Sequence, residues 1–310
     1  MISIQNVSKR FGAVQALEAV SLELPPGSRV ALVGTNGSGK TTLLRAMCGL
    51  LRVEGRITLY GSDVAKEPQV ALRSLSSMPQ IAPPLDAPVV ELVRAFCVLR
   101  NRNPLAVAAR AKRLGLDLET VARTRVRDLS GGMKQKLLAA LALTAEAPVL
   151  VCDEPTANLD PAARRVFFEE VLARPTNSIL VLCSHRVDEV QHLVERVVQL
   201  DEGRVVADGS LSQTLARMRG FRVDLTFREP PDAAEVATLV ARGFAPSGPT
   251  RFHGEFSEVD KVEVVSRLVA TWGPRLLDLS LQDSDALHEK GELAPRGATA
   301  KVIPLRAVSP

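Results

Sequence analysis

Apolar residues in the first 60 positions recur in short runs that predict β-strands. Ile2–Val7 and Val20–Leu24 alternate with period two, Pro25–Gly27 predicts a turn, and Ile57–Gly61 predicts a strand that ends in a turn. Val30–Val33 is apolar without interruption, which is typical of a buried strand. The chain is therefore expected to begin with a series of short strands.

The pattern then changes to one that favours helices. No helix breaker interrupts Val89–Phe96 or Ala106–Leu114, so we expect a mostly helical stretch from Val89 to Glu119. Pro104 fits the first turn of the second of these helices, because its fixed φ is compatible with that position. A further helix is expected after Gly131-Gly132.

Two later apolar runs predict strands of a parallel sheet. Val149–Cys152 and Ile179–Cys183 are continuously apolar, as in strands that are covered on both faces. The helical pattern Pro161–Ala173 lies between them, so the three segments predict a βαβ unit. Arg196–Leu200 and Arg204–Ala207 predict a last pair of strands.

A domain boundary is expected near Arg217–Gly220, because the pattern beyond it differs. The expected order is strand, helix, strand, helix and strand, at Phe221–Phe227, Asp232–Arg242, Thr250–Phe256, Val259–Thr271 and Arg275–Leu281. These elements favour a small α+β domain of about 65 residues with a ferredoxin-like order. We therefore expect domains at 1–217 and 218–290, and a poorly ordered tail at 291–310, where prolines and glycines replace large apolar residues.

Composition excludes several classes of protein. The 310 residues carry a net charge of +4 from scattered arginines, and aromatics make up 4%, so neither a nucleic-acid footprint nor a base-stacking platform is indicated. The four cysteines form no CxxC pair and lie in apolar contexts, which favours buried thiols in a reducing compartment. Because the N-terminus lacks a signal-peptide pattern and no apolar run approaches about 18 residues, we expect a cytoplasmic protein.

The most specific chemistry lies in the segment Gly34–Thr42. It fits the phosphate-loop pattern G-x-x-x-x-G-K-[ST], follows the apolar run Val30–Val33 and precedes a helical pattern. Glycines let the backbone curl so that N–H groups point at an anion, and the helix N-terminus adds partial positive charge. Lys40 is expected to bridge the β- and γ-phosphates, and the Thr41 hydroxyl to bind Mg²⁺.

Further motifs narrow this interpretation. Leu129–Gln135 resembles the signature motif of ATP-binding-cassette (ABC) ATPases, and Val149–Glu154, a strand ending in two carboxylates, resembles their second phosphate-site motif. Shorter matches follow in the family's order, at Phe11, Gln80, Ala157–Asp160 and His185. Over residues 1 to about 217 the chain thus resembles the nucleotide-binding subunit of an ABC transporter.

The resemblance implies a fold and a set of cofactors. The implied fold is α/β: a P-loop NTPase with a RecA-like core, an antiparallel β subdomain and a helical subdomain at about residues 85–135, followed by the small C-terminal α+β domain. The implied cofactors are ATP and Mg²⁺. Nucleotide contacts fall on Phe11, Gly34, Asn36, Gly37, Ser38, Gly39, Lys40, Thr41, Thr42, Ser130, Gly131, Gly132 and Asp160.

The resemblance also implies roles at the reacting centre. Thr41, Gln80 and Asp153 would hold Mg²⁺, Glu154 would be the general base, and His185 would contact the γ-phosphate, with Gln80 coupling the site to a membrane subunit. Two simpler interpretations stay open at this point: Phe11 as an ordinary core or surface residue, and Asp160 as the N-cap of the helix that begins at Pro161.

The implied partners are a second copy of the chain and a separately encoded membrane permease. In this family two subunits pack head to tail, with ATP between the phosphate loop of one and the signature of the other. The chain would then lie peripherally on the inner face of the cell membrane, and no nucleic acid is expected. The alternatives are a soluble ABC ATPase that acts on nucleic acid or ribosomes and a non-catalytic regulatory module.

Departures from the commonest family pattern favour export. Met133 stands where the signature usually has Gln, as in subunits that resemble the ABC-2 export-type group, and Asp278–Leu287 resembles that group's ending, a strand followed by an acidic helix. The Cys183–His185 segment and the overall length are also similar to the ATPases that assist copper-site maturation of nitrous oxide reductase. No substrate is inferred from that likeness.

Overall fold

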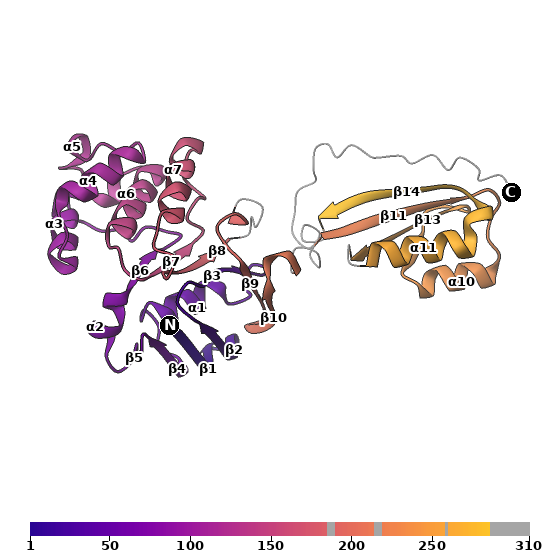
Figure 1. The fold of residues 1–310 in the computed structure, drawn as a ribbon, viewed down its shortest axis with the longest axis horizontal. Helices are drawn as coiled ribbons and strands as arrows, with labels where there is room; N and C mark the ends of the chain where they lie inside the picture. Colours follow the sequence, from indigo (N-terminus) through magenta and orange to yellow (C-terminus); the bar gives the residue numbers. More distant parts are fainter. Residues whose placement is uncertain (185–189, 214–218, 258–259, 286–310) are drawn as a thin grey trace. The chain divides into compact units, whose positions relative to one another are not determined.

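The computed structural model describes residues 1–184, 190–213, 219–257 and 260–285 (Figure 1). The chain divides into two compact units, Met1–Leu211 and Ser212–Pro310, and each is described by itself. The boundary that the sequence predicts between residues 217 and 218 lies outside the described residues, and so does the tail expected at 291–310.

An antiparallel sheet opens the first unit. Its strand order is β2-β1-β4-β5. Register pairs Ile2 with Leu24 and with Leu59, so the alternating apolar residues of neighbouring strands share one buried face. These four strands are β1 (Ile2–Phe11), β2 (Val14–Leu24), β4 (Glu54–Leu59) and β5 (Ser62–Asp63).

A six-stranded sheet forms the centre of the unit, with the order β10-β9-β3-β8-β7-β6. Its members are β3 (Arg29–Val33), β6 (Leu75–Met78), β7 (Val149–Asp153), β8 (Ile179–Cys183), β9 (Arg196–Asp201) and β10 (Arg204–Ser210). All neighbours pair in parallel except β9 and β10, which form an antiparallel hairpin. Every residue of β7 and β8 is buried, which confirms the prediction of strands covered on both faces.

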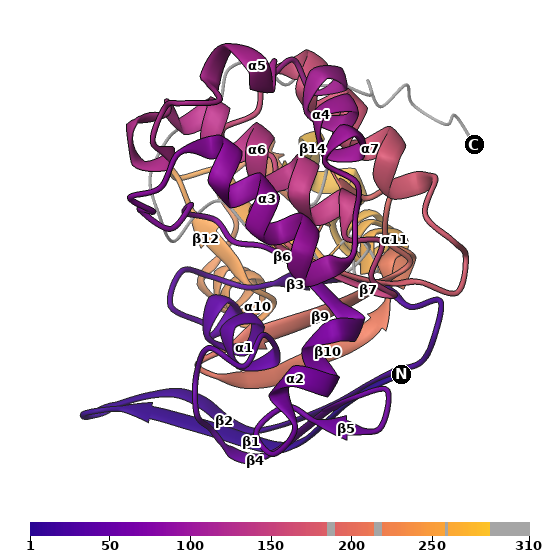
Figure 2. The ribbon, with the colours of Figure 1, turned by 90° about the vertical axis from the view of Figure 1, so that its left-hand side faces the viewer.

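The two sheets of this unit share one hydrophobic core. Helix α1 (Lys40–Met47) contributes Leu43 and Met47 to the same cluster of buried residues as Ile4 of β1 and Val151 of β7. Figure 2 shows α1 above the β1-β2-β4 sheet. The helix that follows the phosphate loop is therefore packed against both sheets, which fixes the position of its first turn.

Two asparagines separate the first two long helices of the segment between β6 and β7. The stretch Val89–Glu119 is not one helix, because Asn101 adopts a left-handed conformation with φ 51° and the Asn103 side chain caps the next helix at Leu105 N. The helices of this unit besides α1 are α2 (Pro68–Ala71), α3 (Val89–Arg100), α4 (Pro104–Arg113), α5 (Leu118–Val121), α6 (Gly131–Thr144) and α7 (Pro161–Leu172).

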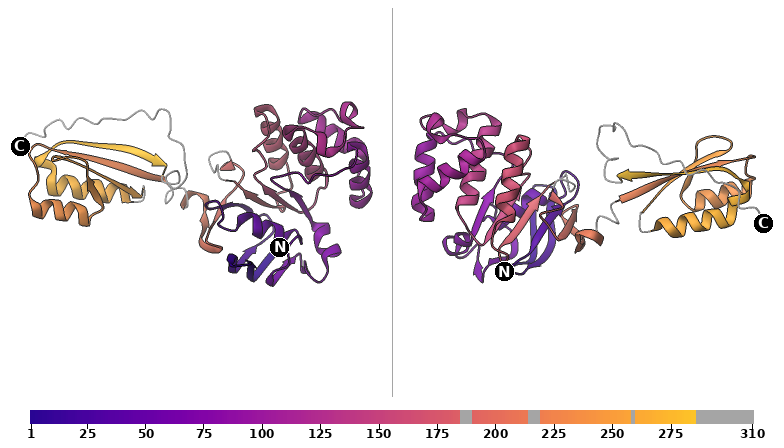
Figure 3. Two further views of the ribbon diagram at one scale, coloured as in Figure 1. Left: turned by 180° about the vertical axis from the view of Figure 1, so that it is seen from behind. Right: turned by 45° about the horizontal axis from the view of Figure 1, so that its top comes forward.

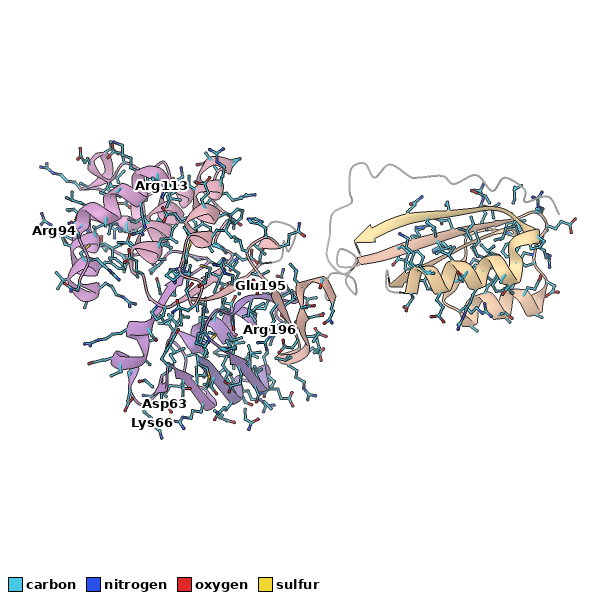
Figure 4. The ribbon with its side chains drawn as sticks, in the orientation of Figure 1. Asp63, Lys66, Arg94, Arg113, Glu195 and Arg196 are labelled. Carbon is cyan, nitrogen blue, oxygen red and sulfur yellow. The ribbon has the colours of Figure 1, made fainter. Side chains whose placement is uncertain are left out.

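Ion pairs join these helices to one another. Arg110 of α4 lies 3.4 Å from Glu146, in the turn after α6, and 3.3 Å from Glu170 of α7. Arg113, labelled in Figure 4, also pairs with Glu170. The half-buried Glu170 therefore meets two cations from α4, which attaches α4 to α7.

The second unit is a four-stranded antiparallel sheet with two helices on one face (Figure 3). Its elements are β11 (Arg219–Phe227), α10 (Ala233–Ala241), β12 (Phe244–Pro246), β13 (Arg251–Ser257), α11 (Lys261–Trp272) and β14 (Leu276–Asp285). The order β12-β13-β11-β14 in a βαββαβ chain is that of the ferredoxin-like motif. Phe221, Val223, Leu225 and Phe227 alternate along β11 and fill its core.

Strand β14 is longer than the sequence predicts. The pattern predicts a strand that ends at Leu281, but β14 continues to Asp285, and the end of the segment Asp278–Leu287, which resembled a strand followed by an acidic helix, lies outside the described residues. The reason is pairing: β14 matches β11 along its whole length, from Leu276 opposite Phe227 to Asp285 opposite Arg219.

Across the described ranges, no helix has the length and apolar content needed to cross a bilayer. Helix α6, with 14 residues, falls short of the roughly 20 that a membrane span requires.

The single tryptophan of the chain allows a test of the C-terminal core. Trp272 is 3% exposed and packs in the same cluster as Phe221. We expect Phe221→Ala to destabilise this unit by about 3–5 kcal/mol, because it leaves a cavity among buried aromatics. Tryptophan fluorescence during urea unfolding should show an earlier transition. Leu277→Ala, at a 58% exposed position, is the control, and equal midpoints for the two variants would contradict the assignment.

Candidate functional site

The phosphate loop connects the end of β3 to the start of α1, and its glycines are required by space. Gly34 and Gly39 have φ values of 145° and 102°. A Cβ on Gly34 would lie 2.1 Å from the Leu200 carbonyl oxygen, and one on Gly39 would lie 2.4 Å from that of Ala16. Any side chain at either position would therefore displace backbone, so the loop can take this path only as glycine.

The side chain of Lys40 folds back onto the start of this loop. This side chain is buried, and its Nζ donates hydrogen bonds to the carbonyl oxygens of Gly34 at 2.8 Å and Thr35 at 2.9 Å. Helix α1 receives no side-chain cap from the described residues and has no acidic residue in its first turn. The N-terminus of α1 and the Lys40 ammonium group thus bring positive charge to the phosphate loop, which suits a phosphate group.

Two carboxylates lie where β7 ends: Asp153 is the last residue of the strand and Glu154 follows it. Asp153 is 7% exposed, and its Oδ1 is buried without a hydrogen-bond partner among the described residues. Glu154 is also buried and adopts a left-handed conformation with φ 48°, which a backbone hydrogen bond from its N–H to the Cys183 carbonyl oxygen, 2.9 Å, helps to hold. Such strain costs about 1–3 kcal/mol and is concentrated at functional sites.

A single pocket brings most of the predicted residues together. Its lining comes from the phosphate loop, the first turn of α1, the segment after β6, and the ends of β7 and β8. These lining residues are Asn36, Gly37, Gly39, Lys40, Thr41, Thr42, Gln80, Asp153, Glu154 and Cys183. The unpartnered Asp153 oxygen, the Thr41 hydroxyl and the Gln80 amide supply the hard oxygen donors that a divalent cation prefers.

Cys183 is the pocket residue that the sequence did not predict to be there. Burial raises the pKa of its thiol, and the charge of Asp153 adds to the effect. The thiol is therefore protonated at neutral pH and is unsuited to act as a nucleophile. The described cysteines are all free.

The signature residues lie on a different part of the chain from this pocket. Ser130 is exposed and caps α6, with its Oγ accepting a hydrogen bond from Met133 N at 3.2 Å. Gly131 and Gly132 form the first turn of that helix, and none of the three belongs to the pocket lining. The structure of one chain therefore does not bring the predicted signature residues to its own phosphate loop.

Two further predicted residues can be compared with the simpler interpretations. Phe11, at the end of β1, is 47% exposed and has the Lys9 ammonium group 5.2 Å from its ring centroid, so it is not a core residue. Asp160 caps α7 through Oδ1, which accepts from Ala163 N at 2.9 Å, as the N-cap interpretation predicts. His185 lies outside the described residues.

Sequence reasoning missed the contacts that hold α6 against the segment after Glu154. Gln135 is 1% exposed and donates from Nε2 to the Pro155 carbonyl oxygen at 3.2 Å, and Lys136 Nζ lies 2.6 Å from Asp160 Oδ2. The Lys136 hydrogen bond lowers the pKa of the Asp160 carboxyl group. The signal in the sequence was a glutamine on the otherwise apolar, buried side of a helix, where a polar group requires a partner.

Comparisons with known proteins agree on one family. The family model described as ABC transporter matches residues 17–157. The chain is 33% identical over 249 residues to the daunorubicin resistance ATP-binding protein DrrA3 of Streptomyces coeruleorubidus, covering 78% of each chain. It is 34% identical over 251 residues to the Nod factor export ATP-binding protein I of Paraburkholderia xenovorans, covering 78% of this chain and 82% of that protein.

Solved structures give the same result for the fold. An ATP-binding subunit of an ABC transporter matches with a TM-score of 0.62 and 25% identity, over 69% of this chain and 91% of the other. A bacterial Atm1-family ABC exporter with ATP bound matches with a TM-score of 0.61 and 26% identity, over 70% of this chain and 40% of the other.

The ion pair between α6 and α7 makes a prediction about pH. Because the pKa of Asp160 is lowered in the folded chain, the pair stabilises the fold above the carboxyl group's ordinary pKa of about 4 and loses its contribution as the pH falls through the lowered value. Lys136→Met should therefore lower the melting temperature at neutral pH, and the difference from the unmodified chain should shrink under acid conditions.

Lys134→Met, on the same helix, is the matched control. The Lys134 ammonium group donates to the Arg127 carbonyl oxygen and pairs with no carboxylate among the described residues. Its effect should not follow the titration of a carboxyl group. Circular-dichroism melting curves across the acid range measure both variants, and a pH-independent difference for Lys136→Met would show that the pair does not act in this way.

Proposed function

This chain belongs to the ATP-binding proteins of ABC transporters, and from that premise we propose that it hydrolyses MgATP between two of its copies to drive export through a membrane permease. As a member of this family it binds ATP and is an ATPase. The proposal concerns the residues that do this, the metal ion, the second copy and the permease.

The observation that carries the proposal is the convergence of opposite charges in one pocket. Lys40 and the first turn of α1 present positive charge, whereas Asp153 and Glu154 line the same pocket with carboxylates. A triphosphate alone would be repelled by the carboxylates, but a triphosphate with a divalent cation satisfies both groups. The metal ion, when bound, would neutralise charge that develops on the phosphate oxygens.

Each side chain then has a separate task. Lys40 would turn its ammonium group from the carbonyl oxygens of Gly34 and Thr35 to the β- and γ-phosphates. Thr41, Asp153 and Gln80 would hold the cation, which would give the buried Oδ1 of Asp153 a partner. Glu154 would orient a water molecule and accept its proton. Its positive φ is the kind of backbone strain that is concentrated at functional sites.

A second copy would complete the site. Ser130, Gly131 and Gly132 form an exposed helix N-terminus, which is a good phosphate ligand, yet none lines the pocket of the chain that carries it. The same residues from a partner copy could cover the γ-phosphate of a nucleotide held by the phosphate loop. Hydrolysis would then remove the group that joins the two copies, and the dimer would open.

The permease is proposed from the relatives' names and from an apolar groove. The relatives are named for Nod factor export and daunorubicin resistance. The groove is lined by Leu44, Arg45, Cys48, Leu50, Ser77, Met78, Pro79, Gln80, Ile81, Val151 and Asp153. Leu50 and Ile81 are 70% and 79% exposed at its edge, so an apolar segment of a membrane subunit could dock beside Gln80. The chain would thus lie on the inner face of the cell membrane.

Removing the proposed general base tests the chemistry. Glu154→Gln keeps the shape of the side chain but cannot accept a proton, so turnover should fall by about 10²–10⁴-fold while ATP still binds. Phosphate release measures turnover, and light scattering should show a dimer that persists with ATP. Normal turnover would overturn the role of Glu154 without affecting the assignment of the phosphate loop.

Purification from membranes tests the coupling to a permease. The tagged chain should co-purify with a polytopic membrane protein, and Ile81→Glu should release it, because a charge at the groove opposes apolar docking. Val206→Glu, at an exposed apolar position on β10 outside the groove, is the control. A chain that is recovered alone from the soluble fraction in every case would contradict the proposal, and salt-sensitive binding of nucleic acid would favour the alternative ABC ATPase function.

A further inference from the structure

The turn between β9 and β10 touches the phosphate loop at a residue, Gly203, that does not line the pocket. Gly203 N, in this turn, donates to the Ser38 carbonyl oxygen at 3.1 Å, and the Gly203 carbonyl oxygen accepts from Glu18 N of β2 at 2.9 Å. One turn residue therefore connects the phosphate loop to the antiparallel sheet. The sequence predicts a turn at Asp201–Gly203, between the last two strands, but not its contact with the phosphate loop.

Three backbone segments meet here with no room for a side chain. A Cβ on Gly203 would lie 2.9 Å from the Ala16 carbonyl oxygen and 3.0 Å from the Leu17 Cα, whereas one on Gly39 would lie 2.4 Å from the same Ala16 oxygen. Gly203 also has a φ of 79°, which other residues rarely adopt. The Ala16 carbonyl oxygen thus lies close to the phosphate loop and to the turn.

Charged side chains tie the same hairpin to β2 at both ends. Arg204 makes a two-point contact with Glu18, at 2.6 and 3.0 Å. Arg196, labelled in Figure 4, makes a two-point contact with Asp208 and donates to the Glu23 carbonyl oxygen at 2.9 Å. Exposed ion pairs of this kind add little stability, but they limit the positions that the hairpin can take relative to β2.

We propose that Gly203 is a positioning residue for the nucleotide. By holding Ser38 on one side and Glu18 on the other, it fixes the distance between the phosphate loop and the β1–β2 hairpin, whose tip carries Phe11. The spacing between the phosphate and adenine contacts is thereby set before ATP binds. This inference rests on the proposed role of Gly34–Thr42 as the phosphate-binding loop and of Phe11 as the adenine contact.

Gly203→Ala tests the proposal against a matched glycine. Gly61, in the β4–β5 turn, also has a positive φ, 89°, but its added Cβ would meet nothing within 4 Å. Both variants carry backbone strain, and only Gly203→Ala presses on Ala16 and the loop. Isothermal titration with MgATP, on chains whose circular dichroism is native, should show the Kd raised about tenfold or more for Gly203→Ala and less than about twofold for Gly61→Ala.

The unmodified chain, titrated in parallel, distinguishes a failure of the phosphate-loop assignment from a failure of the positioning role of Gly203. If it fails to bind MgATP, the phosphate-loop assignment fails; if it binds and Gly203→Ala binds equally well, the positioning role alone is overturned. A merely structural role for Gly203 would lower the melting temperature and leave the Kd unchanged well below that temperature.

Amide hydrogen exchange gives a second measurement that needs no variant. With MgATP, the amides of Glu18 and Gly203 should exchange more slowly than without it, although both lie outside the pocket. The amide of Val64, which bonds the Ile57 carbonyl oxygen at 3.0 Å next to the Gly61 turn, should gain less protection. Equal protection at the three amides, or none, would overturn the proposal even if Gly203→Ala did not fold.

Discussion

The close approach of backbones around the phosphate loop is the constraint on which this chain depends. Gly34 lies against the Leu200 carbonyl oxygen of β9 and Gly39 against that of Ala16 of β2, at distances that exclude any side chain. The loop is therefore held between the two sheets of the first unit, and its residues Asn36, Gly37 and Gly39 line the pocket. Because the backbones of β9 and β2 pack against the loop, its curled conformation does not depend on a bound ligand.

The parallel sheet converts this loop into a site. In a parallel sheet the carboxyl ends of the strands share one edge, so the loop after β3, Gln80 in the segment after β6 and the two acids at the end of β7 lie close together. Burying Asp153 and Glu154 near one another is unfavourable without compensation, since both are desolvated. Lys40 lines the same pocket, and a bound cation would supply the rest of the compensation.

The local sequence pattern was enough to predict most strands of the first unit and the phosphate loop. It failed where contacts between distant segments determine the structure. The strands at Val149–Cys152 and Ile179–Cys183 were predictable because they are apolar throughout. The phosphate loop was predictable because its glycines and its lysine lie within one short segment of the chain. Strand β6 was not, since Ser76 and Ser77 hide its apolar character, and Ser76 is buried only because its hydroxyl bonds the Ala142 carbonyl oxygen of α6. The same limit applies to Gly203, whose partners lie near residues 16 and 38.

The segment from Glu154 to Asp160 shows how two halves of a site can act together. Both carboxylate oxygens of Asp160 are engaged within the chain, one with the first turn of α7 and the other with Lys136 of α6. Gln135 holds the Pro155 carbonyl oxygen, and an added Cβ on Gly132 would lie 3.2 Å from the Asn158 carbonyl oxygen. The start of α6, which carries the signature, is thus fixed to the segment that begins with Glu154. If a partner copy binds the start of α6, as proposed above, a displacement of α6 must move this segment or break a buried contact. The proposed signature half-site would thus be mechanically connected to the carboxylate half-site of the same chain.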